Sequence, residues 1–163
     1  MYYILVDESL LKKVSDLLKQ KKLTIATAES CTGGLISHSL TNIPGSSDYF
    51  DRGIISYSNE SKNQLLSVSN EILKKYGAVS KQVAKVMAEG VKKNSNVDIG
   101  LSTTGIAGPT GGTEVKPVGL VYIGIAFKNN TIIKKFNFSG DRLENKISTC
   151  NAALKLLYEK LNE

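Results

Sequence analysis

The chain has 163 residues, of which 41% are hydrophobic, and this is enough to bury the core of one domain. We therefore expect a single domain over residues 1–163. Apolar runs such as Val118–Phe127 are too short to cross a bilayer, and the amino terminus lacks the apolar stretch of a secretory signal. The sequence thus predicts a cytoplasmic protein without a membrane partner.

The charge and the cysteine count exclude further classes of protein. A net charge of +6 suits an anionic ligand, but the lysines are spread in pairs and form no basic stripe with stacking aromatics, so we expect no nucleic-acid partner. The two cysteines, Cys31 and Cys150, and the single histidine, His38, do not have the spacing of a zinc site. Chemistry without a transition metal is favoured, and we expect no metal and no cofactor. The alternative is a hard cation such as magnesium held by carboxylates, although the fifteen acidic residues form no dense cluster.

The first third of the chain predicts a helix, a strand and a second helix. Apolar residues recur at helical spacing over Glu8–Lys22, which predicts an amphipathic helix. Leu23–Ala28 reads as a short buried strand, and Gly33–Leu40 as a helix that follows a polar turn. Pro44-Gly45-Ser46-Ser47 ends that helix.

The middle of the chain predicts a second strand followed by helices. Tyr49–Tyr57 is the strand candidate, and Ser58 is a plausible N-cap for the helix that follows it. Helical patterns continue through three further segments, which are Gln64–Leu66, Asn70–Tyr76 and Ser80–Lys93, the last with Ser80 as its N-cap.

The last third predicts three strands and a closing helix. Asp98–Thr104, Val118–Phe127 and Thr131–Phe138 are the strands, and Asn129-Asn130 joins the last two as an antiparallel hairpin. Asp141–Leu161 is an amphipathic helix. Strands that alternate with helices early and pair as a hairpin late predict an α/β fold, a three-layer α/β/α arrangement with a mixed central sheet.

Polar residues follow the first predicted strand, at Glu29-Ser30-Cys31-Thr32. A serine on a strand-to-helix turn is well placed as a nucleophile, because the N–H groups that follow it can stabilise an oxyanion. Two alternatives remain open. Ser30 or Thr32 could only cap the helix, and Cys31 is a rival nucleophile that more often serves as a small packing residue.

A serine nucleophile needs a base, and the segment Gly53–Lys62 offers Tyr57 and Lys62. His38 lies within an apolar helical pattern, so no Ser–His–Asp triad can be assembled. Lowering a lysine pKa to near 7 costs roughly 4–5 kcal/mol and demands burial or a nearby positive charge. The alternative is that Lys62 is a solvated lysine in the first turn of a helix.

A third polar segment, Ser102–Gly112, is rich in glycine and can present backbone N–H groups to an anion. Further along the chain, Arg142 could bind a phosphate with help from the N-terminus of the last helix. The alternatives are a flexible surface loop and an exposed arginine. Ligands of open α/β sheets bind beyond the carboxyl ends of strands, so the three segments could line one pocket.

Seven short motifs, in order and at similar spacing, resemble the CinA carboxy-terminal domain family. They are Ala28-Glu29-Ser30-Cys31-Thr32-Gly33-Gly34, Pro44-Gly45-Ser46-Ser47, Ser56-Tyr57-Ser58-Asn59-Glu60-Ser61-Lys62, Gly77-Ala78-Val79-Ser80, Gly105-Ile106-Ala107-Gly108-Pro109, Lys116-Pro117-Val118-Gly119 and Gly140-Asp141-Arg142. The resemblance implies a metal-free amidohydrolase that converts nicotinamide mononucleotide to nicotinic acid mononucleotide and ammonia, in pyridine-nucleotide recycling.

The resemblance also implies roles for individual residues. Ser30 would be the nucleophile, and Tyr57 and Lys62 would act in proton transfer, although which of the two takes the proton stays open. The remaining implied site residues bind substrate, and they are Thr32, Gly33, Ser47, Thr104, Gly105 and Arg142. We expect a homo-oligomer. The competing hypothesis is a catalytically silent nucleotide-binding or interaction protein linked to competence or the DNA-damage response.

Overall fold

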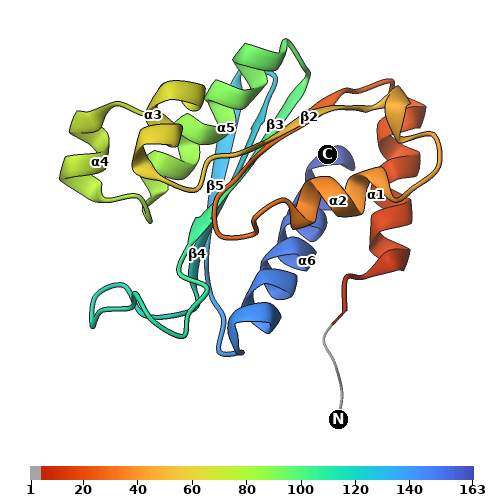
Figure 1. Ribbon diagram of the computed structural model, residues 1–163. Coiled ribbons are helices and arrows are strands. Elements are labelled where there is room, and N and C mark those ends of the chain that lie inside the picture. Colours follow the sequence, from red (N-terminus) through yellow and green to blue (C-terminus); the bar gives the residue numbers. More distant parts are fainter. Residues whose placement is uncertain (1–4) are drawn as a thin grey trace.

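One mixed sheet with strand order β2-β1-β3-β4-β5 organises the computed structural model, which describes residues 5–163 (Figure 1). The strands are β1 (Ile25–Glu29), β2 (Phe50–Ile55), β3 (Ile99–Gly105), β4 (Leu120–Phe127) and β5 (Asn130–Asn137). The helices are α1 (Glu8–Lys21), α2 (Leu35–Thr41), the short 3-10 helix η1 (Ser46–Asp48), α3 (Asn59–Leu66), α4 (Asn70–Tyr76), α5 (Lys81–Ser95) and α6 (Arg142–Leu161).

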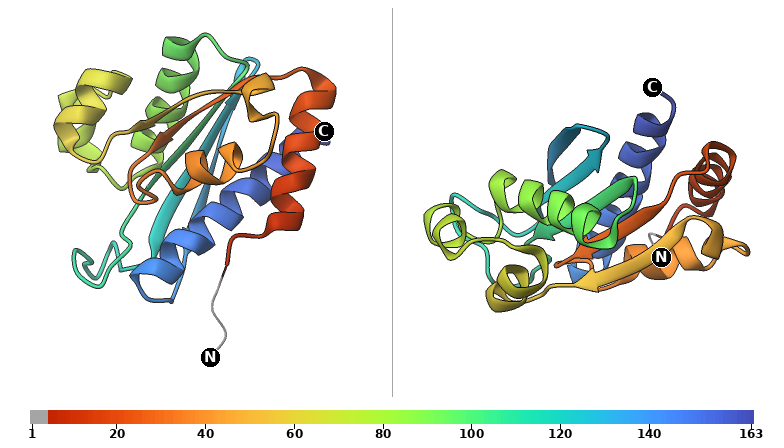
Figure 2. Two further views of the ribbon diagram at one scale, coloured as in Figure 1. Left: turned by 45° about the vertical axis from the view of Figure 1, so that its right-hand side comes forward. Right: turned by 90° about the horizontal axis from the view of Figure 1, so that it is seen from above.

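Helices cover both faces of the sheet, as the expected α/β/α arrangement requires. The views in Figure 2 show α1, α2 and α6 on one face and α3, α4 and α5 on the other. Each group has its own apolar cluster, one centred on α1, α2 and α6 and the other on α5 with α3 and α4. Every residue of β1 is buried, as is typical of a parallel strand that has helices on both sides.

Strand β1 lies between β2 and β3 and pairs in parallel with both, so the carboxyl ends of these three strands meet at one edge of the sheet. Backbone hydrogen bonds continue beyond the strands at that edge. The Ser30 N–H donates to the Thr103 carbonyl at 3.0 Å, and the Ser56 N–H donates to the Glu29 carbonyl at 2.9 Å. The predicted convergence of the first two polar segments with the end of β3 is therefore confirmed.

Most predicted elements are confirmed to within two residues at each end, and Ser58 and Ser80 cap α3 and α5 as predicted. Strand β4 begins at Leu120, two residues after the predicted start. The preceding Gly119 has φ +90°, and any Cβ there would overlap the Phe138 carbonyl oxygen. The helix predicted to follow Ser58 and to continue through Gln64–Leu66 is α3, which runs from Asn59 to Leu66.

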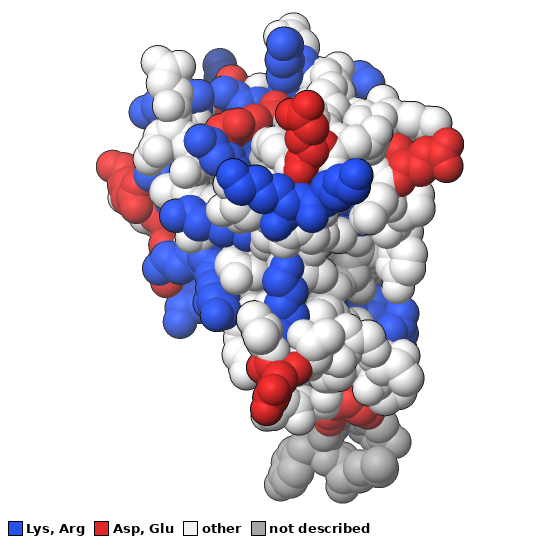
Figure 3. All heavy atoms as spheres, turned by 90° about the vertical axis from the view of Figure 1, so that its left-hand side faces the viewer, with Lys and Arg blue, Asp and Glu red and all other residues white. Residues whose placement is uncertain are grey.

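The surface of the described residues carries mixed charge. On the face drawn in Figure 3, Lys and Arg side chains are interspersed with Asp and Glu side chains. Within residues 5–163, no helix has both the length and the apolar character that crossing a membrane requires.

Candidate active site

Ser30 lies in a tight turn between β1 and α2, and the buried carboxylate of Glu29 organises that turn. Glu29 is 1% exposed and accepts five hydrogen bonds. Three come from the N–H groups of Gly34, Ile36 and Ser37 at the start of α2, at 2.8 to 3.1 Å. The other two come from the hydroxyls of Thr32 and Ser37. A carboxylate at this position satisfies helix N–H groups and interacts favourably with the helix dipole.

This arrangement overturns the interpretation of Ser30 or Thr32 as the helix cap, because Glu29 performs that role. The Thr32 hydroxyl donates to Glu29 at 2.6 Å and lies 2.8 Å from the Thr103 hydroxyl. The Thr32 side chain is fully buried and its hydroxyl is occupied by these two neighbours, so its expected role in substrate binding stays a prediction. The Ser30 hydroxyl is left to interact with α3.

Lys62 reaches the Ser30 hydroxyl from α3 on the neighbouring side of the turn. Its Nζ lies 3.0 Å from Ser30 Oγ, 2.8 Å from the Ser56 carbonyl oxygen and 3.0 Å from the Tyr57 carbonyl oxygen. A neutral amine has two N–H bonds and one lone pair. With the two carbonyls accepting the two N–H bonds, the lone pair is directed at the serine hydroxyl.

Burial favours the neutral form of Lys62. The side chain is 1% exposed, and this desolvation lowers its pKa from 10.5 to about 8. The interpretation of Lys62 as a solvated first-turn lysine is therefore wrong. A buried, hydrogen-bonded lysine with a lowered pKa is suited to removing a proton from the adjacent hydroxyl.

Cys31 lies next to Ser30 but has the character of a packing residue. Its side chain is 6% exposed, and burial raises the pKa of the thiol to about 12, so the thiolate is scarce at neutral pH. The backbone has a different role at this position. Among the hydrogen bonds of residues 5–163, none is donated by the N–H of Cys31 or of Thr32. These two N–H groups follow the serine directly, the position from which backbone donors can serve an oxyanion.

Tyr57 and Arg142 close another side of the same region. Arg142 donates from Nη2 to the Tyr57 hydroxyl at 2.9 Å and from Nη1 to the Gly108 carbonyl at 2.6 Å. Tyr57 therefore contacts Lys62 through its backbone and Arg142 through its phenol. Of the two candidate bases, only Lys62 makes a hydrogen bond to the Ser30 hydroxyl.

The N-terminus of α6 is not open to a phosphate, which corrects one expectation. Asp141 caps the helix by accepting from the Glu144 N–H at 2.9 Å, and the Glu144 side chain accepts from the Asp141 N–H. The guanidinium of Arg142 has five N–H donors and makes two observed hydrogen bonds, so it keeps unused donors at this position.

A cavity of about 570 Å³ lies beside Arg142, within the range of small-molecule sites. Its lining is largely apolar, and the residues are Ala107, Pro109, Val118, Gly140, Asp141, Arg142 and Leu143. The glycine-rich segment lines one side of this cavity, and the start of α6 lines the other. The cavity is large enough for a heteroaromatic ring or a sugar.

Two expected substrate-binding residues do not face this region. Ser47 lies in η1, before β2 begins, and the neighbouring Tyr49 carbonyl pairs with the N–H of Ile25 at the start of β1. It thus lies at the opposite end of the parallel strands from Ser30, because a parallel crossover must return the chain to that end. The Thr104 hydroxyl is buried and donates to the Ala78 carbonyl at 2.8 Å, whereas Gly105 lies partly exposed at the end of β3.

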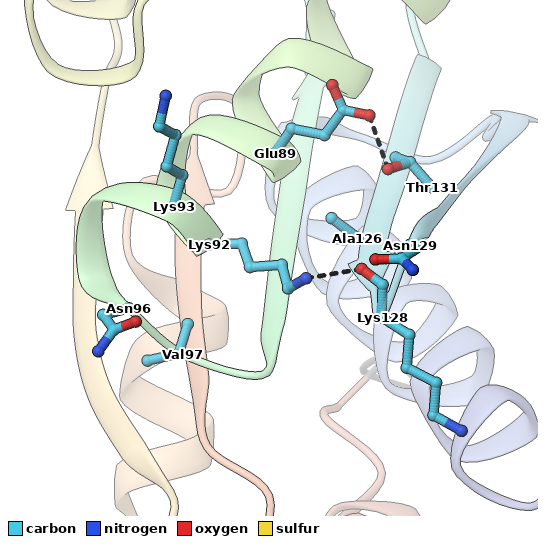
Figure 4. Close-up of a pocket in the computed structure, with 9 residues that line it drawn as sticks. All are labelled: Glu89, Lys92, Lys93, Asn96, Val97, Ala126, Lys128, Asn129 and Thr131. Atoms are coloured by element: carbon cyan, nitrogen blue, oxygen red, sulfur yellow. Dashed lines mark hydrogen bonds between the residues drawn. The ribbon is translucent and has the colours of Figure 1, made fainter.

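A second hollow, of about 520 Å³, lies at the far end of the sheet and has polar walls (Figure 4). Its polar groups bind one another. Lys92 donates to the Lys128 carbonyl at 2.7 Å, and Thr131 donates to Glu89 at 2.8 Å. In Figure 4 the side chains of Lys93 and Lys128 extend away from the centre. This hollow holds no nucleophile next to a base, and the reactive pair lies at the other end of the sheet.

The sequence reasoning did not identify two residues at this site. Glu29 reads as an ordinary charged residue, and only its place directly before the helix start hinted at a capping role. Lys146 projects from α6 onto the turn, where a Cβ atom placed on Gly33 would lie 3.6 Å from its Nζ. Its spacing of four residues from Arg142 was visible, but the placement of α6 was not. Within residues 5–163, no group of three or more His, Cys, Asp or Glu side chains converges.

Comparison with known proteins assigns the chain to a family. Residues 7–161 match the model of the CinA C-terminal domain. A relative from Caldicellulosiruptor bescii with a competence-damage inducible name is 58% identical over 157 residues, which cover 96% of this chain and 38% of the relative. A CinA-like protein of Syntrophus aciditrophicus is 51% identical over 93% of this chain and 36% of its own length. The chain therefore spans less than two fifths of these curated relatives.

Solved structures agree with this assignment over the whole chain. The competence/damage inducible protein CihA from Agrobacterium tumefaciens superposes with a TM-score of 0.93 at 39% identity and covers 100% of both chains. A competence damage-inducible protein A from Klebsiella pneumoniae superposes with a TM-score of 0.93 at 31% identity, over 96% of this chain and 97% of its own. The chain belongs to the CinA C-terminal domain family.

Proposed function

We propose that this chain is a serine amidohydrolase that converts nicotinamide mononucleotide to nicotinic acid mononucleotide and ammonia. The observation that carries the reaction class is the buried pair of Ser30 and Lys62, with 3.0 Å between hydroxyl and amine. The family resemblance supplies the substrate, and the cavity beside Arg142 is compatible with its size.

The first half of the reaction acylates the serine. Neutral Lys62 takes the proton of the Ser30 hydroxyl as Oγ attacks the carboxamide carbon, and a tetrahedral intermediate with an oxyanion forms. The free N–H groups of Cys31 and Thr32 are the donors available to that oxyanion. The Lys62 ammonium then returns its proton to the amide nitrogen. The C–N bond breaks, ammonia leaves, and an acyl ester remains on Ser30.

The second half hydrolyses the ester. A water molecule loses a proton to neutral Lys62 and attacks the acyl carbon, so a second tetrahedral intermediate forms at the same N–H groups. When this intermediate collapses, the bond between the acyl carbon and Ser30 Oγ breaks. Ser30 Oγ recovers a proton from Lys62, and the pyridine carboxylic acid is released as product. Ser56 and Tyr57 accept the lysine N–H bonds with their carbonyls and so keep its lone pair aligned in both halves.

Arg142 is the group that we assign to the phosphate of the mononucleotide. Its guanidinium retains unused donors after bonding to Gly108 and Tyr57, and it borders the cavity. A charged hydrogen-bonded handle remote from the amide can hold the carboxamide against Ser30.

The competing hypothesis, a catalytically silent nucleotide-binding protein, is not favoured by the environment of Lys62. Removing a lysine from water is costly, and an apolar residue in its place would be more stabilising than a lysine. Burial of Lys62 therefore lowers the stability of the folded protein, and such destabilising buried groups are typical of reactive sites. The relatives' names refer to competence and damage, and they do not describe a reaction.

Release of ammonia from nicotinamide mononucleotide by the purified protein is the deciding experiment. Ammonia and nicotinic acid mononucleotide should form in equal amounts in the wild type and not in Ser30→Ala. Mononucleotide that binds but stays intact in the wild type would favour the silent protein, and activity that survives in Ser30→Ala would reject this site.

A further inference from the structure

One buried hydroxyl beside the reactive pair has no hydrogen bond within the part of the chain that the structure describes. The side chain of Ser56 is 0% exposed, yet its Oγ bonds to no other residue of 5–163. Burying a hydroxyl without a partner costs free energy, so the large majority of buried hydroxyls in proteins are paired. An alanine would fill nearly the same space without this cost. The Ser56 hydroxyl therefore calls for an explanation in the chemistry of the site.

Ser56 lies directly across from Ser30 in the sheet. The register of β1 with β2 pairs Glu29 with Ile55. The ladder continues one step further, because the Ser56 N–H donates to the Glu29 carbonyl at 2.9 Å. The next position of each strand is therefore Ser30 on one and Ser56 on the other, in a sheet whose neighbouring strands lie about 4.8 Å apart.

The two serines also share a face of the sheet. Side chains alternate between faces along a strand, and two residues earlier both Ala28 and Ile54 pack into the apolar cluster around α5. This is the face on which α3 carries Lys62 (Figure 2). Lys62 Nζ donates to the carbonyl of Ser56 itself at 2.8 Å. The unpaired hydroxyl thus belongs to a residue that contacts the base and opposes the nucleophile.

The neighbouring polar groups have other partners. Thr104, which follows Thr103 on the other side of Ser30, donates its hydroxyl to the Ala78 carbonyl at 2.8 Å. In the proposed reaction, backbone carbonyls bind Lys62, and backbone N–H groups bind the oxyanion. The water molecule that attacks the ester directs one O–H at Lys62, and its second O–H has no acceptor among these groups. A serine hydroxyl accepts hydrogen bonds as well as donating them.

We propose that Ser56 is a positioning residue whose hydroxyl binds the water molecule that hydrolyses the acyl ester on Ser30. The inference rests on the proposed function, because it concerns the second half of the same reaction. The water donates one O–H to Ser56 Oγ and loses its other proton to Lys62 as its oxygen bonds to the acyl carbon. The bond from that carbon to Ser30 Oγ then breaks, and Ser30 Oγ takes the proton from Lys62. Ser56 neither gains nor loses an atom.

The ester p-nitrophenyl nicotinate separates the two halves of the reaction. Release of p-nitrophenol measures the transfer of the nicotinoyl group to Ser30, and mass spectrometry of the intact protein measures the loss of that group to water. Ser56→Ala should slow the loss by roughly tenfold, the upper end of what one neutral hydrogen bond supplies, and leave the transfer nearly unchanged. Ser56→Thr keeps a hydroxyl and should restore most of the rate of loss. Ser30→Ala should not be labelled.

Ser95→Ala is the matched control. Ser95 carries the other buried hydroxyl that bonds to no residue within 5–163, and it lies at the end of α5, which leads into the amino end of β3. That end is at the opposite edge of the sheet from Ser30, so Ser95→Ala should change neither step.

The pH dependence distinguishes binding of the water from a disturbance of the base. The midpoint of the rate of nicotinoyl loss against pH should be the same in Ser56→Ala as in the wild type, because Lys62 is bound by backbone carbonyls that the substitution retains. A shifted midpoint would show that the variant acts through Lys62 and would overturn the water site.

The remaining outcomes separate the water site from the proposed function. Slowing of the transfer step in Ser56→Ala, or no slowing of the loss step, overturns the water site even if the wild type hydrolyses the mononucleotide. A folded Ser56→Thr protein that is as slow as Ser56→Ala also overturns it. If the wild type leaves the mononucleotide intact but Ser56→Ala slows only the loss of the nicotinoyl group, the water site stands while the amidohydrolase proposal fails. A wild type whose Ser30 is not labelled overturns both. Thermal unfolding verifies that each variant is folded.

Discussion

Lys62 Nζ lies 3.0 Å from Ser30 Oγ although 32 positions separate the two residues in sequence. The contact depends on three elements, because Ser30 directly follows β1, β2 leads into α3, and α3 carries the lysine. The carbonyls of Ser56 and Tyr57 accept hydrogen bonds from the amine N–H groups. A small shift of the backbone at Ser56-Tyr57 would therefore turn the amine lone pair away from the serine.

Ser30→Ala should abolish amide hydrolysis while leaving the fold and most substrate affinity intact. The serine supplies a covalent bond to the acyl group and contributes little packing, so we expect kcat to fall on the order of 10⁴-fold or more. Turnover and equilibrium binding of the mononucleotide should be measured on the same preparation. Cys31→Ala is the neighbouring control and should keep nearly normal turnover, and loss of turnover there with retained activity in Ser30→Ala would exchange the roles.

The rate should depend on pH through Lys62. Only the neutral amine can accept the serine proton, and its pKa is lowered to about 8. Activity should therefore rise about tenfold per pH unit below pH 8 and level off above it, since each unit changes the neutral fraction tenfold. A profile of kcat/KM from pH 6 to 10 measures this. A rate that is flat across that range, or that falls as pH rises through 8, would contradict the assignment of Lys62 as the base.

The same pKa predicts how stability changes with pH. The folded pKa of Lys62 is lower than the unfolded value of 10.5, so the unfolded chain binds more protons between pH 8 and 10.5. Burial of the amine therefore costs stability in full below pH 8, and the cost disappears as pH rises to 10.5. Because one pKa unit corresponds to about 1.4 kcal/mol, a fall from 10.5 to about 8 corresponds to on the order of 3 kcal/mol.

Lys62→Met should consequently raise the free energy of unfolding at pH 7, by on the order of 1–3 kcal/mol after the lost hydrogen bonds are subtracted, and the gain should shrink at pH 10. Urea unfolding at the two pH values provides the comparison. Lys155→Met, at an exposed site on α6, should shift stability little at either pH. A variant that is less stable than wild type at pH 7 would show that the three hydrogen bonds outweigh desolvation.

The sequence predicted the elements well because each one has a distinct periodicity, and it predicted Ser30 because a serine on a strand-to-helix turn has a recognisable setting. It could not predict the burial of Lys62, which lies in a polar stretch. That burial arises only when the fold brings Lys62 on α3 against Ser30 and the carbonyls of Ser56 and Tyr57. Ser47 illustrates the opposite case, since its motif resembled the family's but the parallel crossover places it at the far end of the sheet.

Glu29→Gln should weaken both the fold and the reaction, although this residue touches no substrate in the proposed mechanism. An amide cannot accept all five hydrogen bonds that the carboxylate accepts, and it carries no charge to favour the start of α2. We expect a loss of about 2–4 kcal/mol in the free energy of unfolding, in line with the cost of buried charged hydrogen bonds. Glu71→Gln, in the exposed first turn of α4, should cost well under about 1 kcal/mol.

The kinetic part of the Glu29 test separates positioning from simple instability. Assayed well below its unfolding temperature, Glu29→Gln should show a lowered kcat with a nearly unchanged KM, because the turn that aims Ser30 and the N–H groups of Cys31 and Thr32 is loosened. Glu29→Asp should restore stability in part, since it restores the charge but is one methylene shorter. A Glu29→Gln protein with normal kcat would limit Glu29 to a structural role.

Arg142→Ala should raise KM for the mononucleotide by roughly ten- to a hundredfold and lower kcat much less, because Arg142 is assigned to binding that is equal in the ground and transition states. Truncation also frees Tyr57 and the Gly108 carbonyl from their contacts with the guanidinium, so Arg142→Lys serves as a second variant that keeps the charge without the bidentate geometry. Nicotinamide riboside provides the check on mechanism. It lacks the phosphate, so the wild type should hydrolyse it poorly, and its kcat/KM should be nearly the same in the wild type and in Arg142→Ala. If the riboside is hydrolysed as efficiently as the mononucleotide, Arg142 does not bind a phosphate. Its hydrogen bonds to Tyr57 and Gly108 then have only a structural role.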